Sequence, residues 1–258
     1  MQLSEIKDHW EQAGRDFKMD EVSTSTSRDP YLGKLEEDNI LSCIPNFVSV
    51  LEIGCGDGSH TISYAKKARK LCGIDVSAGL IEIARERMKD MPNVELSVGS
   101  ALILTKIYRQ RFDCIVSQRC LINLPTWEYQ KSAILQYYDV LEKDGVFLLT
   151  EGFDDGLNVL NMSRRNFGLK EIQTVSYNRN LIRDQFESFV SRYFKIVTVQ
   201  NYGFYLFLSR LFHPLAVLPD EPKHDSKLNE VAMKLSRDID GKQFEKYSYN
   251  LFYMLRKK

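Results

Sequence analysis

The sequence has no excess of charge of either sign. Lysine and arginine together number 35, as do aspartate and glutamate, so the formal net charge is zero. A chain without a global positive field does not attract nucleic acid or an anionic membrane over a distance. The composition therefore disfavours a nucleic-acid substrate.

Cysteine and histidine are both scarce. The five cysteines include no C-x-x-C pair, and an odd number in a chain of 258 residues does not suggest a disulfide framework. The four histidines show no ligand spacing with one another or with cysteine. We therefore expect reduced thiols, a cytoplasmic location and no bound metal.

Long apolar runs are also missing. The most apolar stretch, residues 203–218, is interrupted by Arg210 and Pro214 and is shorter than the roughly 18 to 20 apolar residues that span a bilayer. The first ten residues include the charged Glu5 and Lys7, so they lack the apolar core of a signal peptide. We expect neither a membrane span nor secretion.

What the sequence does contain is a regular alternation of strand and helix patterns. Five short apolar runs without polar alternation predict buried parallel strands, and Ser77, Thr126 and Asp29 are predicted to cap helices between or before them. The predicted strands are 48–53, 70–74, 94–98, 112–117 and 146–150, and the predicted helices are 30–44, 78–89 and 127–143, the last ending at Asp144–Gly145. Repeated strand–helix–strand units indicate a doubly wound α/β sheet.

The second half of the chain is less regular. Its pattern predicts helices near 156–166 and 181–192, a strand over 194–200, an insertion over about 203–246 and a last strand over 249–255. Two further strands give a seven-stranded, mostly parallel sheet with an insertion before its last strand.

A glycine-rich turn follows the first predicted strand directly. Gly54, Gly56 and Gly58 occupy every second position, so backbone can approach a ligand there without interference from a Cβ atom. A dinucleotide fingerprint would need its third glycine at position 59, which is Ser59. Asp75 closes the second strand about twenty residues later, where a carboxylate can accept hydrogen bonds from both ribose hydroxyls. The two features together indicate an adenosine ligand.

At these residues the chain resembles the class I S-adenosylmethionine-dependent methyltransferases. The resemblance rests on LEIGCGDG at 51–58 and GIDVS at 73–77, followed in order by GSA at 99–101, FDCIVS at 112–117 and VLEKDG at 140–145. It implies a Rossmann-like core over 48–151 that binds S-adenosylmethionine. It also implies an N-terminal helical cap or lid over 1–47 and an acceptor-side half of the same domain over 152–258.

The resemblance assigns cofactor contacts by position. Gly54, Cys55 and Gly56 would line the methionine portion, Asp75 would hold the ribose, and Gln118 would approach the amino acid end. Val76 would pack on adenine, Ser100 and Ala101 would meet its edge, and Arg28, in a loop that could equally be an exposed cap, could reach the cofactor carboxylate. The full predicted cofactor set is Arg28, Glu52, Gly54, Cys55, Gly56, Gly58, Asp75, Val76, Ser100, Ala101 and Gln118.

The acceptor-site candidates follow the fourth and fifth strands, because ligands of open parallel sheets bind beyond the carboxyl ends of the strands. Glu151 could be a general base, an anchor or a salt-bridged strand end, and Arg119 could bind an anionic acceptor or brace Glu151. Asn123 completes the predicted catalytic set. Asn161 and Arg164, three residues apart, could point together into a cleft or lie on a solvated helix face.

These residues predict methyl transfer to an oxygen or nitrogen atom of a small polar metabolite, a sugar or a glycan precursor. A protein methyltransferase and a catalytically silent protein that binds the cofactor or a partner remain alternatives. The aromatic stretch 203–218 could wall the acceptor pocket, form a homodimer contact or pack in the core.

Overall fold

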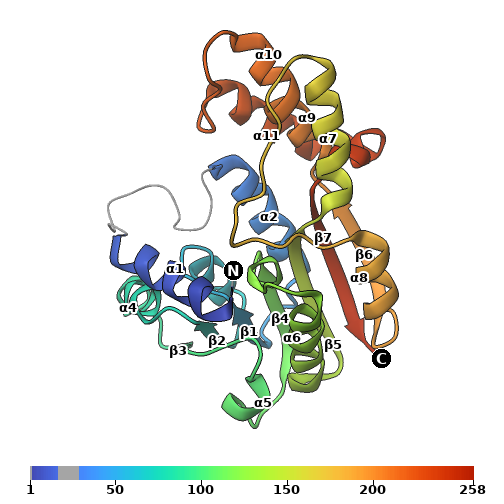
Figure 1. Cartoon of the computed structure of the whole chain (residues 1–258). Helices are drawn as coiled ribbons and strands as arrows, with labels where there is room; N and C mark the ends of the chain where they lie inside the picture. Colours follow the sequence, from blue (N-terminus) through green and yellow to red (C-terminus); the bar gives the residue numbers. More distant parts are fainter. Residues whose placement is uncertain (1, 17–28) are drawn as a thin grey trace.

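A mixed β-sheet forms the centre of the protein, as the computed structural model of residues 2–16 and 29–258 shows (Figure 1). Its strands are β1 (Ser49–Ile53), β2 (Lys70–Asp75), β3 (Val94–Val98), β4 (Phe112–Gln118), β5 (Leu141–Gly152), β6 (Phe194–Asn201) and β7 (Asn250–Lys257). In the described part of the chain these seven strands lie in the order β3-β2-β1-β4-β5-β7-β6. The first five are parallel, whereas β7 is antiparallel to β5 and β6. The predicted fold class is confirmed.

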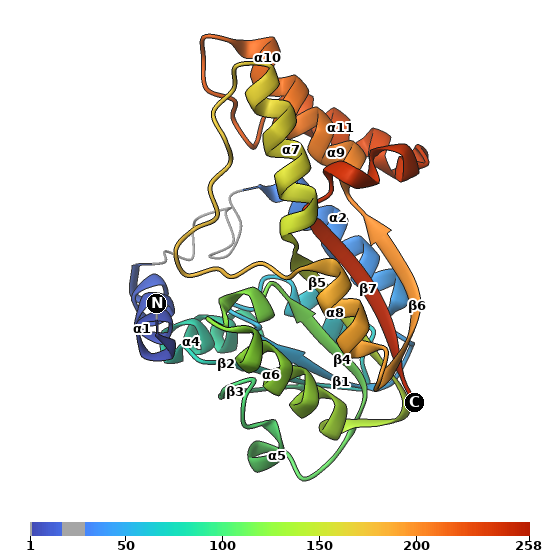
Figure 2. The ribbon, with the colours of Figure 1, turned by 45° about the vertical axis from the view of Figure 1, so that its right-hand side comes forward.

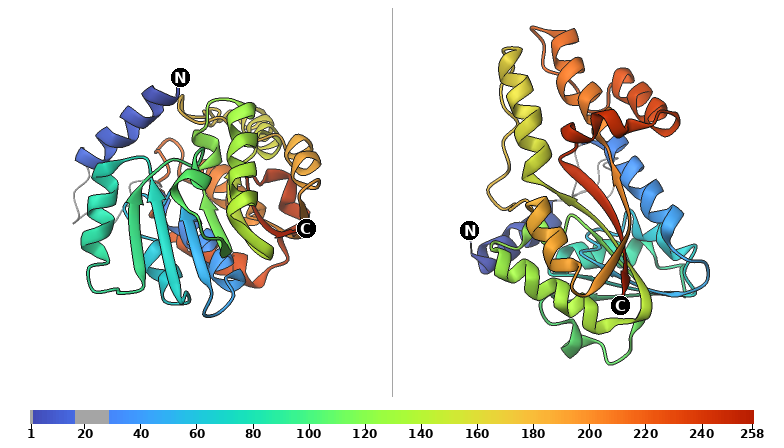
Figure 3. Two further views of the ribbon diagram at one scale, coloured as in Figure 1. Left: turned by 90° about the horizontal axis from the view of Figure 1, so that it is seen from below. Right: turned by 90° about the vertical axis from the view of Figure 1, so that its right-hand side faces the viewer.

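Each face of the sheet carries its own apolar core, because successive side chains of a strand point to opposite faces. One core includes Val50 and is covered by α2 (Pro30–Cys43), α3 (Thr61–Ala65), α9 (Gly203–Phe207) and α11 (Lys227–Asp238). The other includes the next residue, Leu51, and is covered by α5 (Leu104–Ile107), α6 (Trp127–Val140) and α8 (Arg183–Val190). Figure 3 shows helices on both sides of the sheet.

The three predicted helix caps are confirmed. The Asp29 carboxylate accepts hydrogen bonds from the backbone of Tyr31 and Leu32 at the start of α2. Ser77 accepts one from Leu80 at the start of α4 (Ala78–Arg87), and Thr126 caps α6 in the same way. These short polar side chains satisfy backbone N–H groups that have no partner within the first turn of a helix.

The predicted end of the helix over 127–143 is wrong. Helix α6 ends at Val140, and β5 already begins at Leu141, which is buried and pairs with Phe112 of β4. Asp144 adopts a positive φ of 61° inside β5, and the register shifts at this point. The Asp-Gly pair therefore bends a strand instead of closing a helix, because burial of Leu141 against the sheet outweighs the local helix-ending signal.

The N-terminal cap contains a helix that the sequence analysis did not delimit, α1 (Leu3–Asp16). It lies against α4 (Figure 1), where Gly14 and Gly79 meet so closely that a Cβ on Gly14 would lie 2.8 Å from the Leu80 nitrogen. The Glu11 carboxylate accepts a hydrogen bond from the Ala78 N–H at the start of α4. Two small residues and one helix-end contact thus hold α1 beside the carboxyl edge of the sheet.

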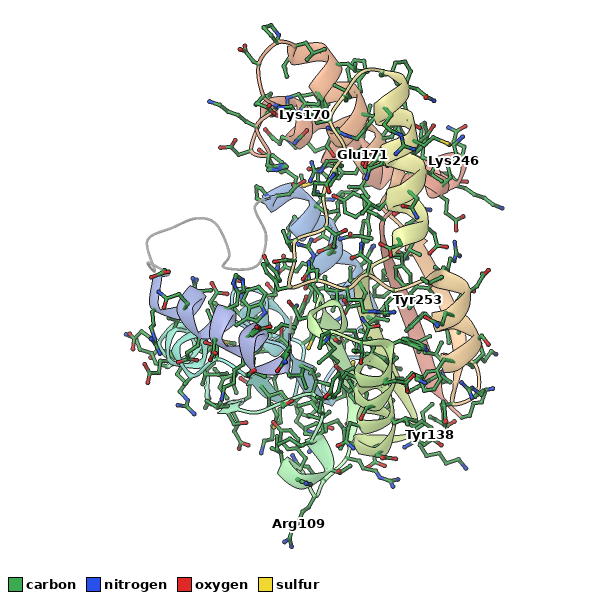
Figure 4. All side chains as sticks on the ribbon, in the orientation of Figure 1. Arg109, Tyr138, Lys170, Glu171, Lys246 and Tyr253 are labelled. Atoms are coloured by element: carbon green, nitrogen blue, oxygen red, sulfur yellow. The ribbon has the colours of Figure 1, made fainter. Side chains whose placement is uncertain are left out.

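A helical layer stands above the carboxyl end of β5 and the amino end of β7, which is antiparallel to it (Figure 2). It consists of α7 (Asp154–Asn166), α9, η2 (Leu208–Phe212), α10 (His213–Val217), α11 and η3 (Gly241–Tyr247), and all but α7 belong to the predicted insertion between β6 and β7. Lys170 and Glu171 lie in this layer, on the loop after α7, whereas Arg109 projects from the opposite end of the molecule (Figure 4). The loop that carries Lys170 and Glu171 runs from the end of α7 towards the sheet and leads to α8.

Candidate active site

A cavity of about 560 Å³ lies along the carboxyl ends of β3, β2, β1 and β4. Its volume falls within the range of small-molecule and cofactor sites. Strand order reverses between β1 and β4, which is where open α/β sheets bind ligands. Seven residues predicted to contact the cofactor line this cavity: Gly54, Gly56, Asp75, Val76, Ser100, Ala101 and Gln118.

The glycine turn and Asp75 form one hydrogen-bonded unit. Gly54 and Gly56 adopt positive φ values of 75° and 54°, which an L side chain rarely adopts. Asp75 accepts hydrogen bonds through Oδ2 from the Gly56 N–H at 3.0 Å and through Oδ1 from the Ser77 N–H at 2.9 Å. Burial raises the pKa of the Asp75 carboxyl, and the neighbouring N–H groups oppose this rise. Each oxygen keeps a second lone pair for ligand hydroxyls at the cavity.

Three residues of the predicted cofactor set do not line the cavity. A Cβ on Gly58 would lie 2.4 Å from Met88 Cε, so this glycine permits α4 to pack on the turn. Cys55 is buried against Gly73. Glu52 is buried in β1, and desolvation raises its pKa to about 8, with Thr61 opposing the rise and Asp75 adding to it. Gly58 thus permits close packing, and the Cys55 and Glu52 side chains are buried beside the turn, so the described cavity lining gives their predicted cofactor contacts no support.

Arg28, the remaining predicted cofactor residue, lies outside the described residues. Its predicted contact with the cofactor carboxylate stays a prediction.

A buried glutamate that the sequence analysis missed organises the β4 end of the cavity. Glu36 of α2 is fully buried and accepts hydrogen bonds from Gln118 Nε2 at 3.0 Å, Arg119 Nη2 at 2.6 Å and Asn250 Nδ2 at 2.6 Å. Gln118 in turn accepts one from the Tyr64 hydroxyl. The available signal was its spacing of four residues from both Leu32 and Ile40 on the apolar side of the predicted helix, where a charge is unfavourable unless it is paired.

Arg119 lies at the cavity. One of the two sequence-based interpretations was that it braces Glu151, but the two side chains form no ion pair. The Arg119 guanidinium pairs with Glu36 instead. The residue has a positive φ of 54°, which turns the chain sharply after β4. Its Nε is buried and has no hydrogen-bond partner among the described residues. Arg119 therefore keeps one donor available for a ligand.

Glu151 is placed differently from the prediction of a general base. The side chain is fully buried and does not belong to the cavity lining. Its Oε1 accepts hydrogen bonds from the N–H groups of Cys120 at 2.9 Å and Leu121 at 2.8 Å, and its Oε2 accepts one from Ile122 at 3.2 Å. This geometry supports a positioning role, in which Glu151 holds the loop after β4, of which Cys120 and Ile122 line the cavity.

Asn123 lines the cavity, but both ends of its amide are engaged. Its Nδ2 donates to the Arg119 carbonyl at 2.6 Å, and its Oδ1 accepts from the Trp10 indole N–H at 3.1 Å. Trp10 of α1 also lines the cavity, together with Tyr177 and Asn178 from the loop after α7. Asn123 thus joins the N-terminal helix to the loop after β4, and α1 roofs the cavity.

The cleft interpretation of Asn161 and Arg164 does not fit their contacts. Asn161 exchanges two hydrogen bonds with the backbone of Ile172, and Arg164 donates to the carbonyls of Lys170 and Arg210. Both side chains hold the loop after α7 in place.

Residues 203–218 are missing from the described cavity lining, and Tyr205 is buried in the core beneath α2. The contacts of Tyr205 agree with core packing for this stretch.

Residues 2–16 and 29–258 contain no group of three or more His, Cys, Asp or Glu side chains arranged to hold a metal ion. No helix in this part of the chain is both long and apolar enough to cross a membrane.

Comparison with known proteins agrees with this geometry. Residues 50–145 match the family model described as a methyltransferase domain. The chain is 38% identical over 76 residues to the probable ribosomal RNA small subunit methyltransferase A of Methanosarcina barkeri (strain Fusaro / DSM 804). That alignment covers 30% of this chain and 24% of the relative, so the chain spans about a quarter of the relative's length.

Two solved structures resemble nearly the whole chain. N-methyltransferase NodS from Bradyrhizobium japonicum WM9, in complex with S-adenosyl-L-homocysteine, superimposes with a TM-score of 0.60 at 15% identity and 98% coverage of both chains. Magnesium protoporphyrin IX methyltransferase (ChlM) from Synechocystis PCC 6803, with bound S-adenosyl-L-homocysteine, gives a TM-score of 0.64 at 13% identity and 99% coverage of both. At these identities the likeness concerns the fold.

Fold, cavity and family match together define the class of protein. Residues 50–145 carry a methyltransferase domain, and the chain has the fold of the class I S-adenosylmethionine-dependent methyltransferases.

Proposed function

We propose that the protein transfers a methyl group from S-adenosylmethionine to an oxygen or nitrogen atom of a small-molecule acceptor. The observation that carries this proposal is one continuous cavity that joins Asp75 and the glycine turn, on the β2 side, to Arg119 and Asn123 after β4. When bound, the cofactor supplies a methyl group on a positively charged sulfur. The chain must hold an acceptor in line with it.

The β2 and β3 side of the cavity suits the adenosine part of the cofactor. The half-buried Asp75 carboxylate offers acceptors to the ribose hydroxyls, and Val76 and Ala101 offer apolar contact to a base. The turn at Gly54 and Gly56 leaves room for the methionine part. An adenosine group would thus meet a carboxylate that the Gly56 and Ser77 N–H groups already hold in place, which favours binding.

The acceptor would lie towards β4, and its activation relies on orientation. In the described part of the cavity lining, Asp75 is the sole carboxylate and there is no histidine. The described lining therefore offers no carboxylate or imidazole base at the β4 end, and alignment of the acceptor with the methyl group supplies the main rate effect. We expect a nucleophile that needs little activation, such as an amine or an acidic hydroxyl group.

Cofactor binding is tested by titrating S-adenosylmethionine into the wild-type protein and into the Asp75→Ala variant. Loss of charge-assisted hydrogen bonds should weaken binding by about 1 to 3 kcal/mol. Asp113→Ala is the matched control, because Asp113 sits at the opposite end of the sheet and bonds Ser49. Equal affinities of wild type and a folded Asp75→Ala variant would contradict the ribose assignment.

Transfer itself is tested with cofactor that carries a deuterated methyl group, incubated with a metabolite extract, a ribosomal RNA preparation and a protein extract in parallel. Label in a small molecule supports the proposal. Label in RNA alone would favour the function named for the Methanosarcina relative, and label in protein alone would favour a protein methyltransferase. Tight cofactor binding without any transfer would indicate a catalytically silent binding protein.

A further inference from the structure

Two aromatic rings stand at the β4 end of the cavity. Trp10 and Tyr177 both line it, with ring centroids 5.6 Å apart and planes inclined by 72°. The His9 ring stacks on Tyr177 at 4.1 Å, and Asn123 holds the Trp10 indole N–H. Neighbouring side chains thus hold both rings in place. A ligand that packs on them therefore binds without the free-energy cost of ordering these two side chains.

Most polar groups around these rings already have partners within the protein. Both ends of the Gln118 and Asn123 amides are engaged, and Glu151 takes up the N–H groups of residues 120–122. Two buried atoms of cavity-lining side chains have no partner among the described residues, the donor Arg119 Nε and the acceptor Asn178 Oδ1. A flat ring that carries two polar substituents could pair with both atoms.

We infer that the methyl acceptor is a planar, aromatic or conjugated molecule that packs against the wall formed by Trp10 and Tyr177. One substituent accepts a hydrogen bond from Arg119 Nε, and another donates one to Asn178 Oδ1. This inference rests on the proposed function and narrows it. It favours a planar, ring-bearing acceptor over a sugar or glycan precursor, because aromatic walls reward planar surface.

The tryptophan content allows a direct measurement. The chain has two tryptophans, and Trp127 packs on Phe189 instead of lining the cavity. In a Trp127→Phe protein the remaining emission comes from Trp10. S-adenosylhomocysteine is titrated first to saturation, followed by catechol or by trans-cyclohexane-1,2-diol. The two probes share six ring carbons and two hydroxyls but differ in planarity.

We expect S-adenosylhomocysteine to change Trp10 emission, and catechol to bind the resulting complex at least tenfold more tightly than the saturated diol. Tyr177→Leu should weaken catechol binding roughly threefold to tenfold, the size of an aromatic pair interaction, and leave the diol unaffected. Asn178→Leu should weaken catechol binding as well. Tyr129→Leu, an exposed tyrosine of α6, is the matched control.

The outcomes separate the two proposals. A folded protein that does not bind S-adenosylhomocysteine overturns the proposed function. If the protein binds S-adenosylhomocysteine normally but binds catechol and the diol with equal affinity, only the inference of a planar acceptor is overturned. So does a Tyr177→Leu protein, verified as folded by its thermal transition, that binds catechol as tightly as the parent. If Tyr177→Leu does not fold, Asn178→Leu with unchanged catechol affinity has the same meaning.

Discussion

Replacing Glu151 by glutamine separates a positioning role from a catalytic one. The glutamine carbonyl can still accept hydrogen bonds from Cys120 and Leu121, but its amide nitrogen cannot accept one from Ile122. One buried N–H without a partner costs about 1 to 3 kcal/mol. At about 3 °C per kcal/mol for a chain of this size, Tm should fall by roughly 3 to 9 °C. Glu151→Ala removes all three acceptor contacts and should cost more.

The assay combines thermal unfolding with turnover measured across pH. Because Glu151 holds the loop and does not touch the cavity, we expect a less than tenfold fall in turnover and an unchanged shape of the pH–rate profile. Glu142→Gln, an exposed carboxylate of the same strand, is the matched control and should change neither quantity. A hundredfold loss of turnover at unchanged Tm would refute the positioning argument and restore the general base.

Three further changes test the supports of the site. Glu52 has a folded-state pKa of about 8, above its ordinary value of 4.5, so its contribution to stability is present below about pH 4.5 and is lost as pH rises through 8. Glu52→Gln should therefore gain stability relative to wild type between pH 6 and pH 9 in urea unfolding, and parallel curves would rule this out. Gly58→Ala places a Cβ 2.4 Å from Met88 Cε at a φ of 77°, so it should lower the free energy of unfolding by about 1 to 3 kcal/mol. An unchanged thermal unfolding curve would contradict this. Asn123→Leu removes the Trp10 hydrogen bond and should speed S-adenosylhomocysteine dissociation roughly threefold to tenfold in stopped-flow fluorescence; an unchanged rate would mean that the roof does not depend on this contact.

Local patterns in the sequence were sufficient for the framework of this protein. Buried strands, helix caps such as Ser77 and the glycine turn before Asp75 depend on residues close together in the chain, so their signals can be read without the fold. The strand–helix alternation then places the carboxyl ends of β1 and β2 side by side, and with them the cofactor half of the predicted site.

Only the tertiary structure gives the contacts of the predicted acceptor-site residues. Glu36 lies 83 residues from Arg119, and Trp10 lies 113 residues from Asn123, so no local pattern links these partners. The prediction that Glu151 could be a general base differs from the observed contacts for the same reason. A carboxylate at the end of a buried strand can face a ligand or neighbouring backbone, and only the path of the loop after β4 selects between them. Burial sets the partners of a polar group, and burial is a property of the whole fold.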